Sequence, residues 1–176
     1  MRLFVYLAGG LIALVTFATV IVFLIGNAIE PRHSTQVARS VLATPAEVAK
    51  LIRNVEAYPS WRHGVSISDL QKHETEATYV ETAFGDVIAY RLDEKSRDKL
   101  FVATITDKTL PFGGTWTFEI STDGGATTLM IREDGVIRDP FYRFFAKYVF
   151  GYDSSIVSYL NSLETELEAS DHQTGP

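Results

Sequence analysis

Few residues in this chain have the types and spacing that catalysis usually requires. Cysteine is absent, which excludes a thiol nucleophile, a cysteine metal site and a disulfide framework. The four histidines form no pair with metal-ligand spacing on one element; they are His33, His63, His73 and His172. The chain has no G-x-S-x-G sequence and no phosphate-binding glycine loop. The sequence therefore predicts no metal and no cofactor, and it leaves any catalytic residue unknown.

The densest group of large side chains is FYRFFAKYVFGY, residues 141–152, in which seven of twelve residues are aromatic. Helical spacing places Phe141, Phe145, Tyr148 and Tyr152 on one stripe. Such a stripe packs a core, lines an apolar ligand pocket or contacts a membrane surface. Core packing and pocket lining overlap when one helix closes a pocket, so these four residues are candidates for a ligand-binding site.

Strand-like segments supply candidates for the facing wall of the pocket. In residues 115–121, alternation puts Trp116 and Phe118 on one face. In residues 75–84, Tyr79 and Glu81 share a face, and Tyr90 in the next segment is a similar candidate. Polar groups inside an apolar pocket orient a ligand. We therefore add these five residues to the candidate site.

Three further candidates come with alternatives. Arg132 shares strand parity with Met130, and if both face inward the arginine binds a ligand carboxylate or phenolate. Otherwise Arg132 forms a surface salt bridge with a carboxylate such as Glu119. Trp61 ends a short helical segment, where it lies either at the mouth of the pocket or in ordinary packing.

The first element of the chain is an apolar segment, because residues 3–29 carry no charge. As a helix, residues 3–25 span roughly 34 Å, enough to cross a bilayer core. We favour an uncleaved transmembrane anchor over residues 1–30 that contacts the lipid bilayer through residues 3–25. A cleaved signal peptide and a buried core helix are the alternatives. The basic N-terminal tail predicts a cytoplasmic N-terminus, and hence an extracytoplasmic soluble domain on a single-pass membrane protein.

Residues 31–176 are predicted to form one α+β domain. A first strand at 34–42 precedes two short helices, and Thr44 and Glu47 form a capping box for the first of them. Strands with regular turns continue to residue 138. Asp139 then caps a long helix that we expect to run over 141–168, in which Gly151 either allows a kink or is tolerated. One long helix against a curved antiparallel sheet of six to seven strands leaves a cavity between them.

This order of elements resembles the helix-grip fold of the START-like, Bet v 1-like superfamily, often called SRPBCC, and in particular its polyketide cyclase/dehydrase-like branch. The segments that carry the resemblance are TPAEV at 44–48, YPSW at 58–61, LPFGGTW at 110–116, REDG at 132–135 and PFYRF at 140–144. The resemblance covers about residues 34–167. It implies the fold and a group that contains cyclases and lipid or hormone binders, without a shared catalytic motif.

The functional prediction is a membrane-anchored domain that binds a small hydrophobic or amphipathic ligand, such as a lipid, isoprenoid or polyketide-like molecule. A polyketide cyclase/dehydratase-like enzyme is the first alternative, with Glu81, Arg132 and pocket tyrosines as acid–base groups. A non-catalytic accessory protein that binds an unidentified protein partner is the second. The net charge of −6 and the lack of a basic run exclude nucleic acid as a partner.

Overall fold

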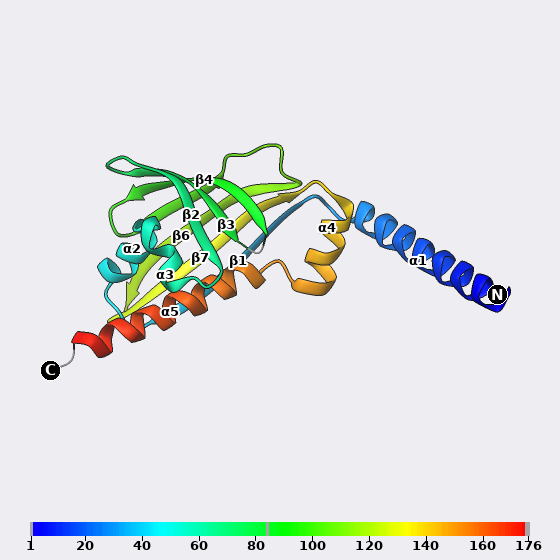
Figure 1. Ribbon diagram of the computed structural model, residues 1–176. Helices are drawn as coiled ribbons and strands as arrows, with labels where there is room; N and C mark the ends of the chain where they lie inside the picture. The colour runs from blue at the N-terminus through cyan, green and yellow to red at the C-terminus, as the bar shows by residue number, and fades with distance from the viewer. Residues whose placement is uncertain (1, 84, 175–176) are drawn as a thin grey trace.

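A long exposed helix leads into an α+β domain in this computed structural model, which describes residues 2–83 and 85–174 (Figure 1). The helix is α1 (Arg2–Ala28). Its stretch Tyr6–Ala28 contains an 18-residue window with a mean hydropathy of 2.6, and the domain buries none of that window. The helix is therefore long and apolar enough to cross a membrane, and the alternative of a buried core helix is wrong.

The domain is built on one antiparallel sheet with the strand order β1-β7-β6-β5-β4-β3-β2. The strands β2 to β7 pair in chain order, while β1 crosses over to pair with β7, where Val37 faces Ile131. This arrangement confirms the predicted sheet of six to seven strands. The bounds are β1 (Arg32–Val41), β2 (Val65–Lys72), β3 (Glu76–Ala83), β4 (Asp86–Ser96), β5 (Leu100–Ile105), β6 (Phe112–Asp123) and β7 (Ala126–Ile137).

Three short helical segments join β1 to β2: α2 (Pro45–Arg53), the 3-10 turn η1 (Val55–Ala57) and α3 (Tyr58–Trp61). The predicted capping box starts α2, because the Glu47 amide donates to the Thr44 hydroxyl at 3.3 Å and the Thr44 amide donates to the Glu47 carboxylate at 2.7 Å. The Tyr58 hydroxyl donates to the Ile52 carbonyl at 2.7 Å and ties α3 to α2. Helix α2 lies at the end of the sheet away from α1 (Figure 1).

Helix α5 (Ser154–Thr174) covers one face of the sheet, which we call the inner face (Figure 1). It buries side chains at helical spacing, including Ile156, Leu160 and Leu163. At its polar edge, Arg39 of β1 donates to Asn161 at 2.6 Å and to Glu164 at 3.0 Å. The core therefore lies between the sheet, α2 and α5, as in a helix-grip fold.

The predicted single helix over 141–168 is wrong, because the structure divides this range at Gly151, the position at which a kink was left open. Asp139 caps a short helix α4 (Pro140–Phe145) by accepting from the amides of the next turn, and a π-helical turn η2 (Ala146–Phe150) follows. Gly151 then reverses the chain with φ of 82° before α5 begins. Glycine adopts this left-handed conformation freely, whereas other residues incur about 1–2 kcal/mol. Phe141, Phe145 and Tyr148 therefore lie outside the helix that covers the sheet.

Helix α4 packs against the C-terminal end of α1 (Figure 1). A Cβ at Gly26 would overlap the carbonyl oxygen of Pro140, so the two backbones approach as closely as glycine permits. The Phe23 and Phe141 rings are 5.7 Å apart, and the buried Arg143 donates to the Ile29 carbonyl at 2.9 Å. Because β1 begins and β7 ends beside this junction, we call this end of the sheet the anchor end and the other the α2 end.

Candidate functional site

The inner face of the sheet is fully enclosed at the α2 end and only partly covered at the anchor end. Phe101, Leu129 and Ile131 have exposed fractions of 0% toward the α2 end. Toward the anchor end, inner-face side chains remain half-buried; they are Ile88, Tyr90, Ile105, Trp116 and Glu133. A ligand therefore meets the inner face most readily at the anchor end.

A charged pair lies at this end of the inner face. Arg62, which directly follows α3, donates from Nη1 and Nη2 to the two carboxylate oxygens of Glu81 at 2.7 and 2.8 Å. The side chains are 17% and 8% exposed. The guanidinium carbon lies 5.0 Å from the Tyr58 ring centroid and 5.1 Å from that of Tyr159, so the cation also contacts two aromatic rings. The pair is net neutral, which suits a site with little water.

Tyrosines surround the charged pair. Tyr79 of β3 stacks on Tyr90 of β4 with ring centroids 5.5 Å apart. Burial raises the pKa of Tyr159 to about 12, and it raises the pKa of both Tyr58 and Tyr79 well above the ordinary tyrosine value. These phenols therefore stay protonated at neutral pH. None of them acts as a base, and Tyr58 already donates its proton to the Ile52 carbonyl.

Three buried polar atoms near this cluster have no hydrogen-bond partner among the described residues: Trp61 Nε1, the Tyr159 hydroxyl and His33 Nδ1. The Trp61 and Tyr159 rings touch, with centroids 5.4 Å apart, so their two donors belong to one region. An unsatisfied buried polar group costs about 1–3 kcal/mol, and native structures contain few of them. Such donors are suited to an oxygen acceptor on a bound molecule.

A second polar group extends along the inner face toward β1. The Trp116 indole donates to one carboxylate oxygen of Glu133 at 2.7 Å, and His33 Nε2 lies 3.0 Å from the other. Tyr152, just before α5, stacks on the His33 ring with centroids 4.3 Å apart. Trp116 also touches Tyr159 at 5.9 Å, which joins this group to the tyrosine cluster. The inner face thus carries a continuous aromatic and polar strip.

The structure brings together six of the residues proposed from sequence: Trp61, Tyr79, Glu81, Tyr90, Trp116 and Phe118. Tyr152 joins them through His33. Met130 and Arg132 occupy the opposite parity of β7, and the inward orientation of Arg132 is wrong. Its half-exposed guanidinium donates to Asp134 at 3.0 Å, so the alternative of a surface salt bridge is confirmed with a different carboxylate.

Five residues of the strip were not proposed from sequence: His33, Tyr58, Arg62, Glu133 and Tyr159. Parity within β7 places Glu133 opposite Arg132, so alternation alone would have identified it once the sheet face was known. Tyr159 shares the buried stripe of α5. The pairing of Arg62 with Glu81 depends on packing between distant segments, and no local pattern signals it.

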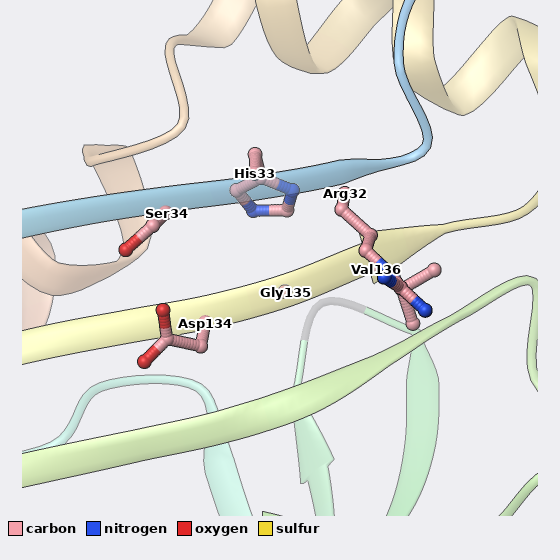
Figure 2. A pocket seen from close by; sticks show the side chains of 6 residues that line it. All are labelled: Arg32, His33, Ser34, Asp134, Gly135 and Val136. Atoms are coloured by element: carbon pink, nitrogen blue, oxygen red, sulfur yellow. The ribbon is translucent and has the colours of Figure 1, made fainter.

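Two cavities lie outside the tyrosine cluster, and the first of them touches the strip at His33. The first, of about 470 Å³, runs along β1 and β7, and Figure 2 shows its lining residues on these two strands, with His33 and Ser34 on β1 and Asp134 on β7. This cavity is an open groove. The hydrogen bond from Arg132 is the main cause that holds the pKa of the Asp134 carboxyl below its usual range. The other, of about 310 Å³, lies at the α2 end beside Arg53, Glu94 and the β2–β3 turn. The predicted ligand cavity under α5 stays a prediction.

Comparison with known proteins places this geometry in a known fold. Residues 32–168 match a family profile described as polyketide cyclase/dehydrase and lipid transport. Similar solved structures include a START superfamily protein from Mycobacterium smegmatis, with 15% identity and a TM-score of 0.61 over 78% of this chain and 98% of that one. The ZhuI aromatase/cyclase from Streptomyces sp. R1128 has 15% identity and a TM-score of 0.64 over 78% and 94% of the two chains.

Norcoclaurine synthase from Thalictrum flavum shares the fold at 7% identity, with a TM-score of 0.61 over 82% of this chain and 90% of that one. These identities are low, so the likeness concerns the fold and not the chemistry. No curated protein matches the sequence. Because the family profile spans nearly the whole helix-grip domain, the chain belongs to the polyketide cyclase/dehydrase and lipid transport family.

Proposed function

We propose that this chain is a single-pass membrane protein whose domain binds a small apolar or amphipathic molecule at the anchor end of the inner face. The observation that carries the proposal is the group of unpaired buried polar atoms beside the Arg62–Glu81 pair. Donors of this kind gain a hydrogen bond when a bound water or a ligand supplies an acceptor. The half-buried aromatic side chains around them provide the apolar contact area.

The chemistry of the strip indicates a neutral oxygen-bearing ligand. Glu81 already neutralises Arg62 through two hydrogen bonds, so an added carboxylate would have to displace it. A carbonyl or hydroxyl oxygen can instead accept from Trp61 or Tyr159 without any rearrangement of charge. Lipids, isoprenoids and polyketide-like molecules with such groups fit this description.

The proposed anchor is supported by the junction between α1 and α4. Gly26, Phe23 and Ile29 contact α4, and cleavage near residue 28 would separate most of these contacts from the domain. We therefore propose an uncleaved helix that keeps the domain at the membrane, where apolar ligands partition. We propose the extracytoplasmic side for the domain, for which the basic N-terminal tail is the supporting feature against Arg32 and Arg39 on the other side.

The experiment is native mass spectrometry of the full chain extracted in a mild detergent, followed by displacement of an environment-sensitive apolar dye. We expect retained apolar molecules of low mass, and dye binding that falls in the variants Trp116→Ala and Tyr159→Phe. Phe145→Ala is the matched aromatic control, because Phe145 lies outside the strip. Purified protein that neither carries nor binds an apolar compound would exclude this function.

The enzymatic alternative is favoured by one observation, the contact between His33 and Glu133. A histidine held by a carboxylate is a common arrangement for proton transfer. In a cyclase or dehydratase, His33 would move a proton to or from a chain held against the aromatic strip. The variant His33→Gln tests this alternative, because the loss of a proton carrier should lower turnover of a reactive polyketide-like chain far more than it lowers dye binding.

A further inference from the structure

A group of large apolar side chains on α4 and η2 is exposed outside the candidate site. We call it the aromatic patch: Tyr142, Phe145, Tyr148, Val149 and Phe150, with exposed fractions between 42% and 67%. The Phe145 and Phe150 rings touch at 6.3 Å, and the partly buried Phe144 packs against Tyr148 at 5.3 Å. Soluble domains rarely leave such a contiguous apolar group exposed to water, so the aromatic patch indicates an interaction surface.

We propose that the aromatic patch inserts into the interfacial layer of the bilayer that α1 crosses. The inference rests on the proposed anchoring of α1, and the partner to which it commits is a lipid surface. Phenylalanine and tyrosine favour this layer, because their rings are apolar and the tyrosine hydroxyl reaches water.

The α1–α4 junction places the aromatic patch at the right depth. A helix of 27 residues is about 40 Å long, whereas the apolar core of a bilayer is about 30 Å thick. The last turns of α1 therefore reach the headgroup region, and Gly26 fixes the start of α4 against them. Figure 1 shows α4 leaving this junction across the direction of α1, between the anchor and the domain. A segment in that position follows the membrane surface.

Local charge agrees with this placement. The domain is acidic, but residues 140–152 contain Arg143 and Lys147 and no acidic residue. Arg143 is buried and donates to the Ile29 carbonyl. Lys147 is exposed, and its ammonium lies 5.5 Å from the centroid of the Tyr148 ring. A lysine beside interfacial aromatics can extend toward lipid phosphates.

One consequence concerns the ligand site. The aromatic patch and the less covered end of the inner face lie at the same end of the sheet, and Tyr152 connects them in the chain. Insertion of the patch would thus hold the proposed binding site against the lipid surface. A ligand could then pass between bilayer and protein without crossing bulk water.

The test uses single labelled cysteines, which the natural absence of cysteine allows. Three full-chain variants, Val149→Cys, Leu42→Cys and Leu14→Cys, carry a polarity-sensitive fluorophore in vesicles of phosphatidylcholine and phosphatidylglycerol. Leu42 is the exposed control at 99% exposure, and Leu14 reports the anchor itself. The quenchers are brominated lipids from the membrane side and iodide from water.

We expect lipid quenching at position 149 to be several-fold stronger than at position 42, with a blue-shifted emission and weak iodide quenching. Lipid quenching at 14 combined with equal iodide quenching at 149 and 42 would overturn the inference and leave the anchor intact. Protection at 149 from both quenchers would assign the aromatic patch to a second copy or a protein partner, which also overturns it. Failure of lipid quenching at 14 would refute the anchor, and with it this inference.

Discussion

Arg62 binds Glu81 in the same two-pronged manner in which Arg53 binds Glu94 at the opposite end of the sheet. The first pair has nitrogen–oxygen distances of 2.7 and 2.8 Å, and the second has 2.8 and 2.6 Å. The difference is their surroundings. Arg62 lies between two tyrosine rings beside unpaired donors, whereas Arg53 also binds Asp98 at the surface. The chain thus contains its own matched control for the candidate site.

The variant Arg62→Met should lose both stability and ligand binding. Removing one partner of a buried ion pair typically costs about 3–5 kcal/mol, because the remaining charge is left without compensation. Arg53→Met should also lower stability, yet dye binding should stay near the wild-type level. Urea unfolding followed by tryptophan fluorescence gives stability, and dye titration gives binding. Equal loss of binding in both variants would mean that Arg62 acts only through the fold.

Tyr159→Phe should weaken ligand binding without lowering stability. The Tyr159 hydroxyl is buried and makes no well-formed hydrogen bond, although it interacts with the Tyr58 hydroxyl, so its removal should raise the free energy of unfolding by about 1 kcal/mol. The matched variant Tyr58→Phe breaks a bond to the Ile52 carbonyl and should lower stability by a similar amount. Thermal melting of the two variants checks the opposite signs. A destabilised Tyr159→Phe would show that its hydroxyl is already satisfied.

Stability should fall steeply above pH 10. The pKa of Tyr159 is raised to about 12 by burial, and the same cause raises the pKa of Tyr58 and Tyr79. Between the unfolded and folded pKa values the unfolded chain binds fewer protons, so each such tyrosine removes about 1.4 kcal/mol of stability per pH unit. Below pH 10 this contribution is fully present. The slope is measured by urea unfolding at a series of pH values, and Tyr159→Phe should reduce it.

Gly26→Leu should separate α1 from α4, whereas Gly10→Leu should not. A side chain at position 26 overlaps the Pro140 carbonyl, while a Cβ at position 10 meets nothing within 4 Å. Both changes raise helix propensity and hydropathy alike, so they differ only in this contact. A short cross-linker between Phe23→Cys and Phe141→Cys measures the separation. Efficient cross-linking in the Gly26→Leu background would show that the junction is not as tight as the geometry indicates.

Gly151→Ala should destabilise the domain by about 1–2 kcal/mol, because Gly151 has φ of 82° and an added Cβ would lie 2.9 Å from an Asp153 carboxylate oxygen. Alanine favours helix here and would work toward the continuous helix that the sequence pattern suggests. Gly9→Ala, in the open surface of α1, is the control. Unchanged thermal stability of Gly151→Ala would mean that the backbone there adapts at no cost.

Local patterns were sufficient for most of the fold. The alternation of Trp116 and Phe118 predicted an inward face, and the Thr44–Glu47 box predicted the start of α2. Both depend on residues within one element, where periodicity and capping chemistry act directly. The same alternation correctly grouped Tyr79 with Glu81, because side chains two residues apart on a strand share a face.

Contacts between distant segments escaped prediction. The helical stripe of Phe141 and Phe145 is a real pattern, yet the junction with α1 and the conformation of Gly151 detach it from α5. Parity alone did not tell which side of β7 faces the core, so both orientations of Arg132 stayed open until the structure placed it on the outer side. Arg62 became visible as a site residue only when the fold brought it to Glu81.

The hydrogen bond from Arg143 to the Ile29 carbonyl joins residues separated by 114 positions. Under the anchoring proposed above, α1 would be inserted during synthesis well before residue 143 has been made. The anchor would therefore be free to tilt and swivel during most of synthesis, and its orientation would be set only when β7 closes and α4 reaches it. The final orientation of α1 therefore depends on the completed folding of the domain.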